Sequence, residues 1–444
     1  MEVERSAAEA AYLEAFGSAS EALPTAKWLE PAREAARTRF AETGLPHRRL
    51  EAWRWTDLRT IVDREFPPSR TADGAVDAAT LDGSPFAGLD HYRAVFVDGH
   101  YQAGLSDIDG LSEQAECVLL AGGLDDAPAW LEQHFGQAYP QDDDALIALN
   151  TALMADGVAL RVPEGRAVDK PLELVFIGTG ASPQTLSTRN LILVEAGAEV
   201  TVLETHMGPS GGRYVANTAT ECIIRDGATL DHVKVQNESA EAIHLANLHA
   251  AIGAKAKFNT FALNAGSAVT RSQYRVKLGG EGGDTNIASA YMLADRQHCD
   301  TALLVDHAVA GCTSNELFKC VMDDTARGIF QGKIIVRPDA QQTDGMQMTQ
   351  GLLLSEHAEF DAKPELEIFA DDVRCTHGAT SGELDEDLMF YLRSRGIAAE
   401  DAKALLIAAF VGEAIEQVSS EQLRGALNGF VAGLGGYTEG LSDE

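Results

Sequence analysis

Three stretches decide the fold: GAEVTVLETH (Gly197–His206), GATLDHVKVQ (Gly227–Gln236) and GAKAKFNTFALN (Gly253–Asn264). Each begins with a turn-like Gly-Ala pair and continues with alternating apolar and polar residues, which is the period of a β-strand. Their alanines, Ala198, Ala228 and Ala254, follow one another after 30 and 26 residues. A repeat of this length without helices is typical of a solenoid whose coils stack on one another.

The alternation begins at PLELVFIGTG (Pro171–Gly180) and continues without a convincing helix for about 200 residues. Similar strand starts that lack the glycine occur at Ala326 and Ala358. We therefore predict a mainly β fold with a parallel β-helix core over residues 166–382. A sandwich of two antiparallel sheets is the alternative that this pattern leaves open.

Helical patterns flank this core. Thr25–Pro46 has apolar and alanine positions at helical spacing with a Gly-Leu-Pro stop, whereas His91–Tyr101 indicates a strand that enters a turn at Asp98-Gly99. Gly382–Ile397 places acidic residues first and arginines last, as a helix dipole favours. The sequence thus predicts an α-rich N-terminal domain over residues 1–165 and a helical C-terminal region over residues 383–444.

Composition limits the partners. The chain has 444 residues, with 68 acidic against 35 basic residues and a net charge of −33, which repels phosphate backbones and anionic lipid surfaces. We expect no nucleic acid and no membrane as partners. The sequence does not decide whether this acidity reflects a salt-rich host.

No secretory signal and no apolar run of membrane-spanning length is visible in the sequence. The six cysteines form no CxxC pair, which favours reduced thiols. Both observations lead us to expect a cytoplasmic protein.

Two motifs are set aside. Gly328–Ile334, GIFQGKI, resembles a phosphate-binding loop, but it is one residue too short between its glycines and has Ile334 where a magnesium-binding hydroxyl belongs. We expect no nucleotide on this chain. His244 and His249 are five residues apart, on opposite faces of a regular strand, which argues against a metal ion shared by the two.

The segment DDVRCTHGAT (Asp371–Thr380) carries the strongest chemical signal. If it is the last coil, Cys375 and His377 share one face of a strand. Thiol and imidazole suit a soft or borderline metal such as iron, and the imidazole favours the thiolate form. Two ligands do not complete a site, so further ligands would come from a second chain. A buried cysteine beside a capping histidine is the alternative.

A broad apolar stripe marks the C-terminal helix. Leu406 and Phe410 lie on one stripe, with Val411 on the stripe beside it. A face this wide can pack on its own core and on a partner, although a single packing face explains the periodicity equally well.

The segment Leu317–Ile397 resembles the core of the SufB/SufD family, which belongs to the SUF machinery for iron-sulfur cluster assembly. The continuation GATSGELDE (Gly378–Glu386) resembles the SufD branch of that family. Gly44–Arg59, Val95–Tyr101 and Ala148–Gly165 resemble the N-terminal domain of the family. The resemblance therefore covers nearly the whole chain.

This resemblance implies a right-handed parallel β-helix between two helical regions, and a scaffold subunit rather than an enzyme. It implies pairing with the paralogue SufB through the β-helices and with the ATPase SufC through the C-terminal region, where Leu406, Phe410 and Val411 are the candidate contacts. Cys375 and His377 match the family's Cys-x-His, which implies a half-site for a transient iron-sulfur cluster.

Several points stay open at this level. The chain could be a purely structural adaptor that holds SufB and SufC and ligates neither metal nor sulfur. The sequence does not decide whether the isolated chain forms a homodimer, whether a flavin binds the complex, or what Cys312 and Cys320 do. A carbohydrate-active β-helix enzyme is disfavoured, because the adjacent Asp371 and Asp372 point to opposite faces of a strand.

Overall fold

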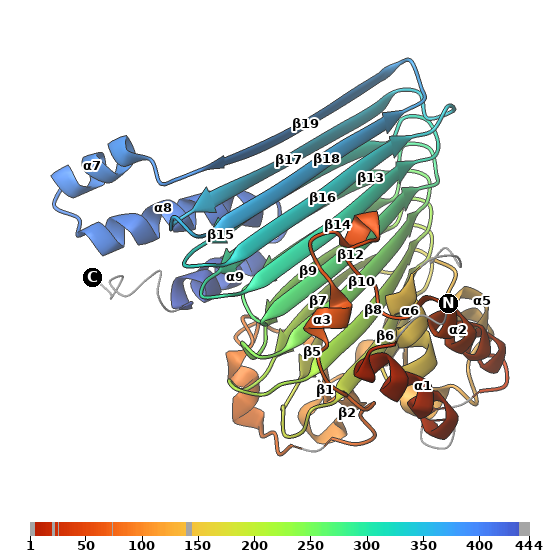
Figure 1. Ribbon diagram of the computed structural model, residues 1–444. Coiled ribbons are helices and arrows are strands. Elements are labelled where there is room, and N and C mark those ends of the chain that lie inside the picture. The colour runs from red at the N-terminus through yellow and green to blue at the C-terminus, as the bar shows by residue number, and fades with distance from the viewer. Residues whose placement is uncertain (1–4, 20–22, 25, 73, 139–143, 435–444) are drawn as a thin grey trace.

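The computed structural model describes residues 5–19, 23–24, 26–72, 74–138 and 144–434. The last ten residues of the predicted C-terminal region, 435–444, lie outside this description. Two long sheets face each other, and the chain crosses from one to the other after nearly every strand, as Figure 1 shows. Neighbouring strands in the core are parallel and in continuous register. The predicted parallel β-helix is confirmed, and the antiparallel sandwich is excluded.

One sheet has ten strands in the order β19-β17-β15-β13-β11-β9-β7-β5-β1-β2. Its strands are β1 (Tyr92–Val97), β2 (His100–Tyr101), β5 (Leu172–Ile177), β7 (Glu199–Met207), β9 (Thr229–Asn237), β11 (Lys257–Asn264), β13 (Asp284–Leu293), β15 (Thr313–Met322), β17 (Thr343–Leu353) and β19 (Val373–Gly382). The pair β1 and β2 is an antiparallel hairpin across Asp98-Gly99, where both residues have positive φ.

The other sheet has nine strands in the order β18-β16-β14-β12-β10-β8-β6-β4-β3. They are β3 (Glu116–Leu119), β4 (Val158–Val162), β6 (Thr185–Val194), β8 (Val215–Ile224), β10 (Ile243–Ile252), β12 (Val269–Leu278), β14 (His298–His307), β16 (Arg327–Val336) and β18 (Glu359–Ile368). Strands β1 and β4 pair in parallel with β5 and β6. The N-terminal part, which the sequence predicts as an α-rich domain, therefore continues both sheets.

One stack of turns joins the coils at a single edge. Its residues with positive φ are Gly165, Gly197, Gly227, Lys255, Gly282, Gly311 and Gln342. The N–H of Gly197 donates to the Asp226 carbonyl at 2.9 Å, and the N–H of Gly227 donates to the Ala254 carbonyl at 2.8 Å. Each turn is thus tied to the next, and glycine recurs because this backbone conformation disfavours a Cβ.

The structure corrects the predicted repeat in two ways. The residue that matches Ala198 and Ala228 in the third turn is Ala256, since Lys255 and not Gly253 takes the positive φ. Ala326 and Ala358 precede β16 and β18 and so lie at the opposite edge of the solenoid.

The same turn stack accounts for Cys312. This residue follows Gly311 and therefore takes the place of the turn alanine, where it is fully buried. Its role is that of a small apolar side chain.

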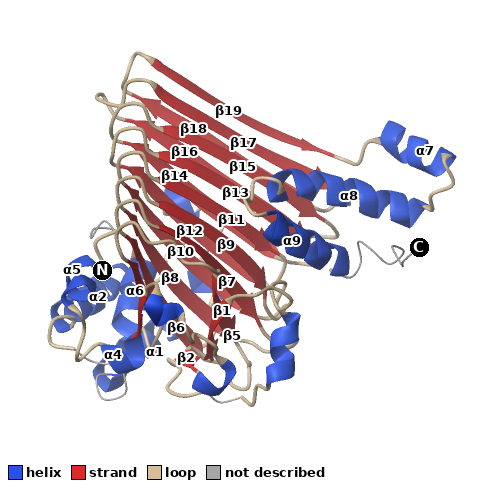
Figure 2. Cartoon of the chain, turned by 180° about the vertical axis from the view of Figure 1, so that it is seen from behind, coloured by secondary structure: helices blue, strands red, loops and turns tan. Residues whose placement is uncertain are grey.

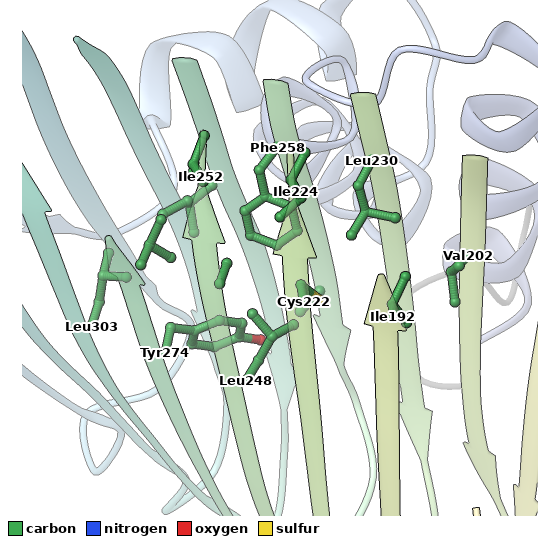
Figure 3. Close-up of a cluster of buried hydrophobic side chains, with 14 of the residues drawn as sticks. Ile192, Val202, Cys222, Ile224, Leu230, Leu248, Ile252, Phe258, Tyr274 and Leu303 are labelled. Carbon is green, nitrogen blue, oxygen red and sulfur yellow. The ribbon is translucent and has the colours of Figure 1, made fainter. Parts of the chain in front are cut away.

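The space between the sheets is the main hydrophobic core (Figure 3). Inward-facing residues from successive coils stack there, among them Val202, Leu230 and Phe258 from one sheet and Ile224 and Ile252 from the other. The alternation in the sequence reflects this single inward face. Most strands are nevertheless buried on both faces, because helices cover the outer sides.

Helices of the N-terminal part cover the first coils of the nine-stranded sheet. A buried cluster joins α1, α2 and α6 to Val215, Ile243 and Leu245. The helices of this part are α1 (Ala7–Ala19), α2 (Glu30–Thr43), α3 (Leu58–Ile61), α4 (Leu120–Gly123), α5 (Ala129–His134) and α6 (Ala145–Leu153), with 3-10 turns at Glu51–Trp53, Ala78–Gly83, Ala103–Leu105 and Leu111–Glu113.

Two C-terminal helices, α8 (Ala399–Ile415) and α9 (Glu421–Gly433), pack on the outer face of the ten-stranded sheet (Figure 2). The preceding helix α7 (Glu386–Ser394) projects away from the body and contacts α8. Asp385 caps α7 by accepting from the backbone N–H groups of Asp387 and Leu388. No described residue covers the last coil, β18 and β19, at the end of the solenoid.

Candidate functional site

The uncovered end of the solenoid is formed by the edge strands of both sheets. Strand β19 pairs with β17, and β18 pairs with β16, while neither has a partner on its other side within the described chain. Each therefore presents a row of backbone N–H and C=O groups that a further strand can take up. The residues of β18 and β19 are exposed or half-buried along their whole length.

Cys375 lies in β19 and faces the interior. Its thiol lies over Gly345 of β17, 3.6 Å from the point that a Cβ there would occupy, and it packs against the last residues of the core. Burial raises the pKa of the thiol, the Gly345 N–H opposes this, and the charges of Asp344 and Glu316 add to it. In the isolated chain the thiol is therefore protonated at neutral pH.

His377 lies two positions further along β19, on the same face as Cys375, and its side chain is exposed. The structure thus places the two predicted residues on one face of the terminal strand. No increase in thiolate character accompanies this placement.

Beneath His377 lies a column of polar side chains that the sequence analysis did not identify. His377 is in register with Gln347, and Gln347 with Glu316. Gln347 Nε2 donates to Glu316 Oε2 at 3.0 Å, whereas Glu316 Oε1 and Gln347 Oε1 are buried without a hydrogen-bond partner. Burial raises the pKa of Glu316 to about 7, against the hydrogen bonds from Ser314 and Gln347. A polar residue on the inward face of an otherwise apolar alternation is the signal that marks this column.

Large apolar side chains surround the same end. Met346 and Met348 are exposed on the outer face of β17, and Ile368 and Phe369 are exposed where β18 ends. Gly378 leaves room for Met348, whose Cε would lie 2.8 Å from a Cβ at that position. Exposed apolar groups of this kind around open strand edges are typical of a surface that is covered in a complex.

A second candidate surface lies at the C-terminal helices. A groove of about 370 Å³ runs between the ends of β17 and β19 and the helices α7 and α8, and Leu406 and Phe410 line it. The centre of the Phe410 ring also lies 4.6 Å from Lys319 Nζ. Val411 is fully buried against the sheet. Contrary to the prediction, its side chain is therefore not accessible to a partner.

The exposed apolar residues near this groove are instead Leu388, Phe390, Tyr391 and Leu405, and the most exposed of them, Phe390, is 74% accessible. Three of the four belong to α7, a helix in which the sequence analysis names no contact residue. The run Leu-Met-Phe-Tyr-Leu in a helix rich in charged residues was the available signal.

The rejected phosphate-loop motif forms the strand β16 and does not precede a helix. Its glycines serve packing: a Cβ at Gly332 would lie 2.5 Å from Gln347 Nε2 and from Phe330 Cζ.

Of the helices that the structure describes, none combines the length and apolar character needed to cross a bilayer.

Two models of known protein families match this chain. The family model for the SUF system FeS cluster assembly SufBD core domain matches residues 176–410, and the model for the SufBD protein N-terminal region matches residues 6–174. The chain belongs to the SufBD family. The boundary between the two matches coincides with the start of the regular coils, and the sequence-based resemblance is confirmed.

Individual SufBD relatives align over most of the chain. The iron-sulfur cluster assembly protein SufD of Escherichia coli is 32% identical over 86% of this chain and 87% of its own length. A SufBD family protein of Synechocystis sp. is 30% identical over 89% of this chain and 88% of its own. The chloroplastic protein ABCI7 of Arabidopsis thaliana is 28% identical over 94% and 87%.

Proposed function

We propose that this chain is a scaffold subunit for iron-sulfur cluster assembly, without catalytic turnover of its own. The observation that carries the proposal is the uncovered last coil, in which two strand edges, an apolar rim and the pair Cys375 and His377 lie together. This combination suits a surface where a second protein completes both the sheets and a ligand set.

The partner we propose at this end is a SufB-type paralogue. A second solenoid with the same two-sheet coil presents matching strand edges, so its sheets can continue those of this chain. A second copy of this chain meets the same geometric requirement, and a homodimer is therefore the competing state of the isolated protein.

The metal or sulfur that passes through this site is cargo. Cys375 and His377 supply a sulfur and a nitrogen ligand, and the partner must supply the rest. A half-site of this kind binds weakly enough to release a finished cluster. The six cysteines are free thiols in the structure, which fits a reducing compartment such as the cytoplasm.

We propose that the SufC ATPase docks on α7 and α8. Leu388, Leu406 and Phe410 line one groove, and Phe390 is exposed on the same helix as Leu388. ATP hydrolysis then belongs to the partner, in keeping with the strand formed by the Gly328–Ile334 segment.

The test uses the purified complex of this chain with its SufB-type and SufC-type partners. We expect Cys375→Ser and His377→Ala to leave assembly of the complex intact and to lower the iron and sulfide bound after anaerobic reconstitution by about 10-fold or more. Thr376→Ala, which changes an exposed neighbour of both residues in β19, is the matched control. If both variants bind iron and sulfide as the unmodified complex does, the chain is a structural adaptor only.

Docking of SufC is tested separately by pull-down. Leu388→Ser and Phe390→Ser should weaken capture of SufC, whereas Arg393→Ala, on the same helix, should not. Unchanged capture by the two apolar variants would rule out α7 as the docking surface.

A further inference from the structure

A buried group of polar side chains lies inside the solenoid, far along the sheets from the uncovered end. His206 of β7, Glu238 after β9 and His244 of β10 come from different coils and meet in the interior. One ligand atom from each lies within 4.8 Å of the other two, and all three residues are buried. Within the described part of the chain, no other set of three such residues comes this close.

The ligand atoms already make polar contacts within the group. His244 Nδ1 lies 2.6 Å from Glu238 Oε2, a contact that a metal ion between the two atoms would replace. His206 Nε2 is 3.3 Å from Glu204 Oε2, so the ion would be bound through Nδ1 of that ring. A carboxylate behind a histidine is the usual arrangement that orients a metal ligand.

Charge favours a cation at this place. The carboxylates of Glu204 and Glu238 face a single buried ammonium, that of Lys234. Two buried carboxylates that face one ammonium favour the binding of a further cation among these side chains.

A small cavity adjoins two of the three ligands. His206 and Glu238 line it together with Thr218 and Gly178, and its volume is about 10 Å³, enough for one water molecule or one ion. The ligand atoms are spread more widely than around a bound ion, so metal binding would draw His206 and the Glu238–His244 pair together across this space.

We propose that His206, Glu238 and His244 bind a divalent ion of the zinc or ferrous type inside the first coils. Two imidazoles and one carboxylate are donors that such ions accept. Lys234 Nζ is 2.7 Å from His244 Nε2, so the bound form requires the lysine to accept the ring N–H as a free amine or to turn toward Glu204. The ion would hold together three coils, independently of the uncovered end.

The experiment measures the metal content of the full chain by mass spectrometry after expression with added zinc and iron, and the visible spectrum after Co²⁺ addition. We expect about one ion per chain and cobalt absorption bands. The double variant Cys375→Ser/His377→Ala should retain both, which separates this site from the proposed assembly half-site.

Conservative variants locate the ligands. His206→Gln, Glu238→Gln and His244→Gln should each lose the ion, whereas His249→Gln should keep it, because His249 is buried on the opposite face of β10. Circular dichroism checks that each variant is folded. The proposal is overturned if the unmodified chain holds fewer than about 0.1 ions and gives no cobalt spectrum, or if the three ligand variants retain a full complement.

Discussion

The two ends of the solenoid are completed in opposite ways. At the N-terminal end the hairpin β1–β2 and the strand β3 close the sheets, and helices cover the outer face of the first coils. At the C-terminal end β18 and β19 have no cover from the part of the chain that the structure describes, and their side chains are largely exposed. The covered end is built to remain folded alone, whereas the uncovered end retains polar and apolar groups that a partner can satisfy.

The two halves also contain different buried charged groups. In the covered half, Arg271 and Asp300 form an ion pair at 2.6 Å, with both side chains inaccessible. Near the uncovered end, the buried Glu316 accepts a hydrogen bond from the Gln347 amide, and one of its oxygens has no hydrogen bond. Buried polar atoms without a hydrogen bond also occur in the covered half, among them Arg33 Nε and Gln184 Nε2, so the difference lies in the charge pairing of these two groups.

The largest effect is expected from breaking the covered half. Asp300 also accepts from Thr56 Oγ1 and Gln331 Nε2, and Arg271 lies 4.4 Å from the Trp53 ring. Asp300→Asn leaves Arg271 as an uncompensated buried charge, so we expect a loss of about 3–5 kcal/mol in the free energy of unfolding, measured with denaturant. A loss below about 1 kcal/mol would show that this half is not held by its buried charges.

A pH series sharpens the comparison at the other end. Glu316 has a pKa of about 7 in the folded chain against 4.5 when exposed, so its contribution to stability is complete below pH 4.5 and is lost as pH rises through 7. This loss amounts to about 3 kcal/mol. We expect Glu316→Gln to be more stable than the unmodified chain at pH 8 and equally stable at pH 4.

The exposed Glu367 of β18 provides the control for this series. Glu367→Gln should follow the pH dependence of the unmodified chain at every pH. If Glu316→Gln also shows the pH dependence of the unmodified chain, the Glu316 carboxyl is in contact with solvent. The polar side chains beneath His377 are then not buried.

Partner binding should respond at the uncovered end only. Phe369 is 60% exposed at the last coil, and Leu50 is 47% exposed in the N-terminal part. We expect Phe369→Ser to weaken association with the proposed SufB-type partner by about 10-fold, or about 1.4 kcal/mol, with unchanged stability of the isolated chain. In sedimentation experiments the Leu50→Ser variant should bind the partner as tightly as the unmodified chain does. If it loses as much affinity as the Phe369→Ser variant, the two regions do not differ in partner binding.

The smallest effect is expected for the ion pair at the uncovered end. Arg374 lies 3.7 Å from Asp344, and both side chains are exposed. Asp344→Asn should therefore change the free energy of unfolding by less than about 1 kcal/mol. A cost comparable to that of Asp300→Asn would remove the distinction between the two ends.

The sequence by itself determined the solenoid and its last coil. The period of two and the turn spacing near Ala198 and Ala228 depend on local backbone preferences, which a linear pattern records. The same alternation placed Cys375 and His377 on one face of a strand, as the structure has them.

Only the tertiary structure decided which coils meet and what covers them. Coils differ in length, so the sequence did not show that Ala256 rather than Ala254 continues the first turn stack, or that Ala326 lies at the other edge. The width of the apolar stripe on α8 did not reveal that Val411 is buried. The column from Glu316 to His377 and the group around His206 arise from lateral register between residues tens of positions apart, which follows from how the coils stack and not from any local pattern.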